Sequence, residues 1–354
     1  MHASSDSSDG VNRDKEQEKL KEYKNVRVVD DNDFSLRQKE LPECGPILIS
    51  EYVTSDGYVD PSNPQAGRWI SVSGPLKVAA VLDYVLWSNE TWGSGHRKSA
   101  NAKHLAWVPY KCRLRYFNTN DITQCAPIIY VGDSRARTQF YNIANLAGVP
   151  NFKATKSHEN IHFSVPNIVT NAKKTDPNKN LTLDYIHIGV KDGFDVHSRM
   201  YMKSKDPVYA KIRTMINSLE KRGNMKTNIV YVDGLGEFAY GLAAAIPGIL
   251  NATLSYVVDE TEKISDTTVF VKTNESPWRY GGGNCNLGRA YSANMLFLKL
   301  LNLKRTHFYL IDTFQTTILR EDEHSDPMHF FEGADFSGNS LSLLNSQIAL
   351  NNLC

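Results

Sequence analysis

A serine follows an apolar run near the middle of the chain. Residues 130–139 read YVGDSRARTQ, and Ser134 stands between the apolar stretch 127–131 and a helix-like stretch that carries two arginines. In parallel α/β sheets, catalytic groups collect at the carboxyl ends of strands, and the N–H groups of a first helical turn can stabilise a developing oxyanion. Ser134 therefore has the position of a nucleophile, although serine is also a favoured helix N-cap. The motif is not the G-x-S-x-G elbow, because Ala136 stands where the second glycine would be.

A serine nucleophile needs a base, and the base needs an acid that orients it. The late segment EDEHSDPMHFF contains Asp326 and His329, three residues apart, which share one side of a helical or tight turn. A solvated, charged loop would have the same composition, so the pair gains meaning only together with Ser134. The same segment holds a rival base with its own acids, namely His324 with Glu321 and Asp322.

A second motif would imply different chemistry. Residues 158–162 read HENIH, a formal match to H-E-x-x-H. On a helix this motif supplies two zinc ligands, here His158 and His162, with Glu159 as general base. However, apolar residues alternate over 161–165 and a proline follows, which predicts an extended segment. We therefore expect no metal here.

Short apolar runs alternate with helix-like stretches from residue 127 onward. Strands are expected at 127–131, 183–190, 228–234, 268–273 and 306–312, and helices at 135–147, 208–222, 288–304 and 342–353. This alternation predicts an α/β fold with a central parallel sheet covered on both faces. Turn-rich sequence over 40–126 predicts an irregular N-terminal region, and the polar stretch 1–35 a disordered lead-in. We expect a single catalytic domain over 36–354.

Composition narrows the classes of partner. A net charge of +1 gives no reason to expect nucleic acid or an anionic membrane surface. No apolar run approaches the roughly 20 residues of a membrane helix, and the polar N-terminal sequence MHASSDSSDG lacks the pattern of a signal peptide. The five cysteines form no CxxC pair and permit two disulfides plus one thiol, or a fully reduced set. Sequons for N-glycosylation, which are weak signals on their own, occur at Asn89, Asn180, Asn251 and Asn274.

Three segments in order along the chain resemble one enzyme group. They are WVPYKCRLRYFNTNDITQC (107–125), IIYVGDSRARTQFYN and the late DPMHF. Together they resemble the PC-esterase group of SGNH (GDSL-like) hydrolases. That group includes the luminal catalytic domain of sialate and capsule glycan O-acetyltransferases and the plant trichome-birefringence-like O-acetyltransferases. The resemblance extends over roughly residues 40–354.

The resemblance implies a flavodoxin-like SGNH-hydrolase fold, a three-layer sandwich around a parallel sheet. It assigns Ser134 as nucleophile, His329 as base and Asp326 as the orienting acid. It also places Arg137, three residues after the serine, near the acyl group, where an ordinary surface ion pair is the alternative. The family's oxyanion-hole motif has no clear counterpart here. The further candidates for the oxyanion hole or for substrate binding are Gly132, Asp133, Gly234 and Asn284.

The implied function is transfer of an acetyl group to a glycan hydroxyl through an acetylated serine. Acetyl-CoA is the expected donor, with no bound cofactor and no metal. We expect a location in the secretory pathway, in the Golgi lumen or outside the cell, and membrane contact only through an anchor outside this sequence. We also expect at least one disulfide between the irregular N-terminal region and the catalytic core. The alternatives are a carbohydrate acetylesterase, a zinc hydrolase using HENIH, and an inactive glycan-binding module.

Overall fold

The computed structural model describes eleven stretches of the chain. They are residues 40–71, 105–149, 160–165, 180–187, 226–232, 266–276, 287–303, 307–318, 331–332, 337–338 and 340–354, with isolated positions at 213, 214, 217 and 259. The lead-in expected at 1–35 and most of the helix expected at 208–222 lie outside these residues.

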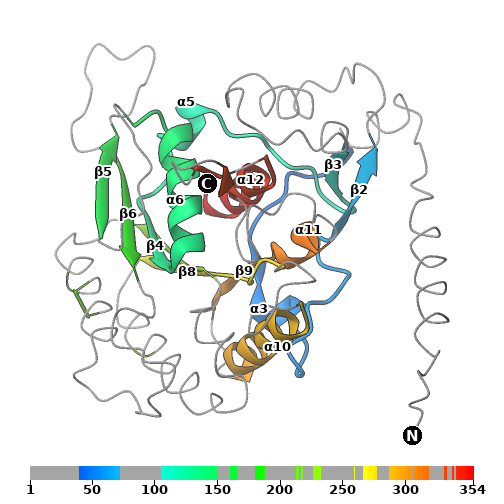
Figure 1. Ribbon diagram of the computed structural model, residues 1–354. Coiled ribbons are helices and arrows are strands. Elements are labelled where there is room, and N and C mark those ends of the chain that lie inside the picture. The colour runs from blue at the N-terminus through cyan, green and yellow to red at the C-terminus, as the bar shows by residue number, and fades with distance from the viewer. Residues whose placement is uncertain are drawn as a thin grey trace, which may run out of the picture.

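A seven-stranded sheet forms the centre of the fold, with the order β1-β9-β8-β7-β4-β6-β5 (Figure 1). Its strands are β1 (Ile47–Leu48), β4 (Ile128–Gly132), β5 (Ile161–Val165), β6 (Leu181–His187), β7 (Thr227–Val232), β8 (Thr267–Lys272) and β9 (Tyr309–Ile311). The five inner strands are parallel, as the sequence predicts, whereas β1 and β5 pair antiparallel at the two edges. The predicted central parallel sheet is confirmed for these five strands, and the two antiparallel edge strands add to it.

β4 lies in the interior of the sheet, and all five of its residues are buried. Such a continuous apolar run is typical of a parallel strand that is covered on both faces. β6 and β7 flank β4 on opposite sides, and in this register Gly132 lies beside His187 of β6. The strand order thus reverses at β4. In open α/β sheets, such a switch point is where ligands bind, beyond the carboxyl ends of the strands.

Helices flank the sheet. They are α3 (Ile49–Tyr52), α5 (Thr119–Ile122), α6 (Ser134–Leu146), α10 (Leu287–Leu303), α11 (Phe314–Thr317) and α12 (Ser340–Leu353). α6 follows β4, packs on β4 and β6, and also contacts α12 (Figure 1). Two short antiparallel ladders complete the described elements: β2 (Gly67–Ser71) with β3 (Leu105–Pro109), and β10 (Phe331–Glu332) with β11 (Ser337–Gly338).

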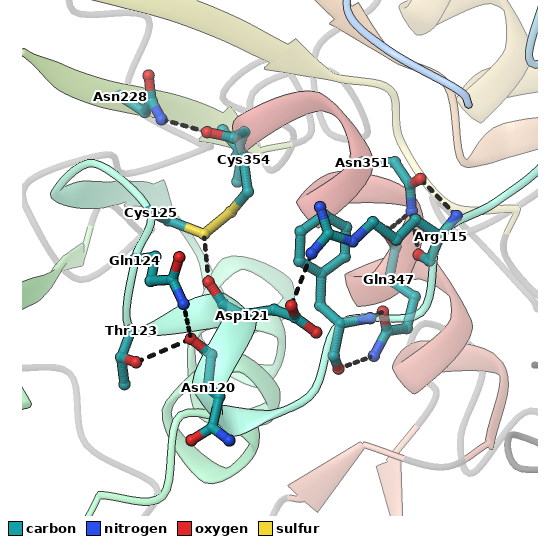
Figure 2. The surroundings of a disulfide bond; sticks show 12 residues. Arg115, Asn120, Asp121, Thr123, Gln124, Cys125, Asn228, Gln347, Asn351 and Cys354 are labelled. Atoms are coloured by element: carbon teal, nitrogen blue, oxygen red, sulfur yellow. Dashed lines mark hydrogen bonds and ion pairs between the residues drawn. A yellow bond between two sulfur atoms is a disulfide. The ribbon is translucent and has the colours of Figure 1, made fainter. Parts of the chain in front are cut away.

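α12 is buried along its length although it is rich in Ser, Asn and Gln. Side-chain amides of α12 hydrogen-bond the backbone of residues 115–117, which lead to β4, as a neighbouring strand would (Figure 2). Asn351 accepts a hydrogen bond from the N–H of Arg115 (2.8 Å) and donates to its carbonyl (2.7 Å). Gln347 does the same for Phe117, at 2.8 and 3.0 Å. Polar residues in this helix therefore pair with backbone groups of this segment, and at Phe117 these groups are buried.

Two disulfides cross-link the turn-rich N-terminal region, one within the region and one to the C-terminus. Cys44 bonds to Cys112 and Cys125 bonds to Cys354, with Cα atoms 4.9 and 5.0 Å apart. The second joins the end of the irregular region to the end of α12 (Figure 2), which confirms the predicted disulfide between region and core. Cys285 lies outside the described residues. Two disulfides fit a protein that folds in an extracellular or luminal compartment. Among the described helices, none is both long and apolar enough to cross a bilayer.

Candidate active site

Ser134 is the first residue of α6, directly beyond the carboxyl end of β4. The N-cap of this helix is Asp133, whose carboxylate accepts a hydrogen bond from the N–H of Arg135 at 2.8 Å. The alternative that Ser134 itself caps the helix is therefore wrong. Its hydroxyl is not committed to the capping role that commonly explains a serine at a helix start.

The exposure of Ser134 differs from that of its neighbours. From Pro127 to Ala144, every residue is buried except Ser134, which is half-buried. Within residues 127–144 the chain is thus partly exposed only at this serine, and the next exposed position is Asn145 near the end of α6. A nucleophile needs such exposure, and a structural serine in a packed core does not.

A buried ion pair between the two residues that flank Ser134 stabilises the turn after β4. Arg135 Nη2 lies 2.9 Å from Asp133 Oδ2, and both side chains are at most 3% exposed. Arg137 is also only 3% exposed, so it is not part of an ordinary surface ion pair. Its predicted contact with the acyl group stays a prediction.

The buried carboxylate of Glu275, which follows β8 at the carboxyl edge of the sheet, lies at the centre of a second polar cluster. Glu275 Oε1 accepts hydrogen bonds from Lys272 Nζ at 3.2 Å, Gln139 Nε2 at 3.3 Å and Asn345 Nδ2 at 3.0 Å. Burial by itself would raise the pKa of Glu275. The charges of Lys272 and Arg135, with the hydrogen bonds, outweigh burial and hold the pKa below its ordinary value. Glu275 is therefore ionised at neutral pH.

Polar residues also follow β8 and β9. Asp312 Oδ1 accepts from Thr273 Oγ1 at 3.0 Å and from the N–H of Phe314 at 3.1 Å. Burial raises the pKa of Asp312, although these hydrogen bonds and Lys272 act in the opposite direction. The neighbouring sequon residue Asn274 is buried, which rules out glycosylation of this site in the folded protein. Sequence reasoning missed these groups; the signal was a polar run directly after each apolar strand.

Tyr185 and His187 of β6 lie against the turn that carries Ser134. Tyr185 Oη is 2.9 Å from the carbonyl oxygen of Asp133, 3.3 Å from that of Gly132 and 2.6 Å from His187 Nδ1. Both side chains are buried. The sequence pattern predicted the strand but not that its aromatic pair would contact the turn after β4, because that contact depends on which strand lies beside β4.

Four residues that the sequence nominated lie outside the described part of the chain. They are Asp326, His329, Gly234 and Asn284; the rival base His324 and its acids lie outside it too. The triad of Ser134, His329 and Asp326 therefore stays a prediction. Of the other nominated residues, Gly132 and Asp133 form the turn before Ser134.

The HENIH segment is extended where the structure describes it. His162 lies on the edge strand β5, and its Nδ1 is 2.7 Å from Asp184 Oδ1 of β6. His158 and Glu159 lie outside the described residues. The prediction of an extended segment is confirmed over 161–165, and the helical geometry of a zinc H-E-x-x-H motif is wrong for it. Within the described stretches, no cluster of three potential metal ligands occurs.

Comparisons with known proteins add no assignment. No model of a protein family matches the chain, and no curated protein matches it significantly. The function must therefore be inferred from the residues of the site.

Proposed function

We propose that the protein is an O-acetyltransferase of the SGNH type, which moves an acetyl group from a donor to a glycan hydroxyl through Ser134. The observation that carries this proposal is the partial exposure of Ser134, alone among residues 127–144, between a buried strand and a helix that it does not cap. The mostly parallel sheet is compatible with the flavodoxin-like three-layer fold of SGNH enzymes. The ordered sequence resemblance supplies the reaction class.

The first half of the reaction acylates the serine. Ser134 Oγ attacks the acetyl carbonyl carbon of acetyl-CoA while the base, which we propose is His329 oriented by Asp326, takes the hydroxyl proton. N–H groups at the start of α6 stabilise the oxyanion that develops on the carbonyl oxygen. The intermediate collapses as the carbon–sulfur bond breaks. The thiolate of coenzyme A leaves with the proton from the base, and an acetyl ester of Ser134 remains.

The second half transfers the acetyl group. A sugar hydroxyl attacks the ester carbonyl, the same base takes its proton, and the serine oxygen leaves and regains that proton. If water attacks instead, the products are acetate and free enzyme, which is the acetylesterase alternative. The two activities share every earlier step, so the acceptor alone distinguishes them.

The described residues contribute a rigid frame for this chemistry. Asp133 caps α6 and pairs with Arg135, so the position of Ser134 is fixed from both sides of the turn. We propose that Arg137 either stabilises the oxyanion or binds an acidic sugar, because a guanidinium can do both. The two disulfides support a luminal or extracellular location, and we propose the Golgi lumen.

Intact-mass spectrometry tests the proposal. The purified protein is incubated with acetyl-CoA or an activated acetyl ester, and we expect one added acetyl group that peptide mapping assigns to Ser134. Ser134→Ala should abolish the adduct. Ser62→Ala, at an exposed serine in a loop, is the matched control and should retain it.

Two results would contradict the proposal: no adduct on the wild-type protein with either donor, or an undiminished adduct on Ser134→Ala. A labelled acetyl donor with added sialylated oligosaccharides then separates the two activities. Label in the oligosaccharide indicates a transferase, and label only in free acetate indicates an esterase.

A further inference from the structure

Two aromatic side chains of β6 lie directly under the turn that carries the proposed nucleophile. Tyr185 and His187 are two residues apart on one strand, so they point to the same face of the sheet. That face is covered by α6, because the ring of Tyr185 packs on Phe140 of α6 with centroids 5.7 Å apart. In the parallel register His187 lies beside Gly132. The pair therefore lies on the side of the sheet where Ser134 begins its helix.

Counting hydrogens favours one hydrogen-bonding arrangement of the pair. The hydroxyl of Tyr185 has one hydrogen, and the carbonyl oxygens of Asp133 (2.9 Å) and Gly132 (3.3 Å) can only accept. If that hydrogen pointed at His187 Nδ1, 2.6 Å away, the hydroxyl oxygen would face two carbonyl oxygens with no hydrogen between them. The favourable arrangement is therefore that Tyr185 donates to Asp133 and that the Nδ1–H of His187 donates to Tyr185.

This arrangement controls a peptide plane next to the nucleophile. The carbonyl of Asp133 and the N–H of Ser134 belong to one planar trans peptide and point in opposite directions. The N–H of Arg137 donates to the same carbonyl oxygen at 3.1 Å, so Tyr185 and Arg137 together occupy its two acceptor positions. A fixed Asp133 carbonyl therefore fixes the direction of the Ser134 N–H, opposite to that of the carbonyl.

We propose that Tyr185 and His187 are positioning residues for Ser134. His187 holds the hydroxyl hydrogen of Tyr185 toward Asp133, and Tyr185 in turn holds the Ser134 peptide so that its N–H faces the oxyanion. This inference rests on the proposed acyl-enzyme function. It gives this chain a support for its oxyanion site in addition to the start of α6.

Three variants at two positions test the pair. Tyr185→Phe removes the hydroxyl that donates to Asp133. His187→Leu removes the Nδ1 donor, and His187→Asn restores an N–H donor near the same place without an imidazole. His307→Asn, at an exposed histidine just before β9, is the matched control. Single-turnover acetylation of Ser134 by an activated acetyl ester gives the rate constant and its substrate dependence, and urea unfolding gives the stability of each variant.

We expect Tyr185→Phe and His187→Leu each to lower the maximal acetylation rate roughly 10- to 100-fold, the range for residues that orient a catalytic group, with the half-saturating ester concentration unchanged. The double variant should be little slower than either single variant, because both act through one hydrogen bond. His187→Asn should recover most of the rate. A purely structural role would lower stability and leave the rate of the folded protein unchanged.

The outcomes separate this inference from the function on which it rests. A wild-type protein that is not acetylated at Ser134 overturns both. Normal acetylation of Ser134 in Tyr185→Phe and His187→Leu overturns the positioning role alone, as does a failure of His187→Asn to do better than His187→Leu. Nitrogen NMR of the imidazole is a readout that needs no activity. A proton on Nδ1 at neutral pH is expected, and a neutral ring protonated only on Nε2 would overturn the inference.

Discussion

The buried carboxylate of Glu275 allows a direct test of how much a buried charge stabilises the candidate site. Its Oε1 accepts hydrogen bonds from Lys272, Gln139 and Asn345. Glutamine at this position can keep an oxygen in that place. Glu275→Gln therefore removes the negative charge while an acceptor oxygen can remain for these three donors.

The expected cost follows from the burial of the partners. Lys272 is completely buried and Arg135 is 3% exposed, so neither cation regains water when the charge is removed. Removing one member of a buried ion pair typically costs about 3–5 kcal/mol, because the remaining charge stays in a medium of low polarity. We expect Glu275→Gln to lower the free energy of unfolding by about 3 kcal/mol at pH 7.

Urea unfolding followed by circular dichroism, repeated across pH, measures the size of this stability loss and the direction in which it changes with pH. The pKa of Glu275 in the folded protein lies below its ordinary value of 4.5, so its stabilising contribution is present above about pH 4.5 and is lost as pH falls through the folded value. Glutamine does not titrate. The stability difference between wild type and Glu275→Gln should therefore be largest near neutral pH and shrink below pH 4.5.

The matched control is an ion pair at the surface. Asp56 and Lys299 lie 3.8 Å apart and are 71% and 44% exposed, so Asp56→Asn should cost about 1 kcal/mol or less. If Glu275→Gln costs no more than Asp56→Asn at pH 7, or if its cost does not change between pH 7 and pH 3, the charge of Glu275 does not stabilise the carboxyl edge of the sheet.

Three further predictions concern stability and chemistry elsewhere. The hydroxyl of Tyr130 is buried with no hydrogen-bond partner among the described residues, so Tyr130→Phe should raise the free energy of unfolding by about 1 kcal/mol in urea; a clear loss would reveal a partner. Replacing Cys125 and Cys354 by alanine should cost about 2–5 kcal/mol, at the upper end because 229 positions separate them, and an unchanged urea midpoint would refute this. If Arg137 stabilises the oxyanion, Arg137→Ala should lower kcat roughly 100- to 1000-fold. A raised KM alone would show that Arg137 binds the acceptor, and wild-type values of both constants would show that its role is structural.

The local elements could be read from the sequence because burial imposes a period on the chain. The expected strands and helices from β4 to α12 match the observed ones to within three residues at either end, where the structure describes them. Apolar runs of strand length separated by amphipathic stretches leave few other ways to bury that surface. The same local pattern placed Ser134 at a strand–helix junction and β5 in an extended conformation. Five cysteines set the limit of two disulfides, but their connectivity could not be read from spacing.

Long-range packing decided the rest. Periodicity tells which face of a strand is buried but not which strand lies beside it, so neither the antiparallel edges β1 and β5 nor the contact of Tyr185 with the turn after β4 could be predicted. The same holds for Glu275 and Asn345, which are 70 positions apart and meet only because the segment after β8 lies beside α12. Asp133 and Ser134 are adjacent, and both residue types are favoured helix caps, so the sequence does not tell which of them caps α6. The backbone angles of the structure assign the cap to Asp133. The sequence thus determined the elements and the position of the proposed nucleophile. The tertiary structure determined the residues that support it, since they come from distant segments that only the folded sheet brings together.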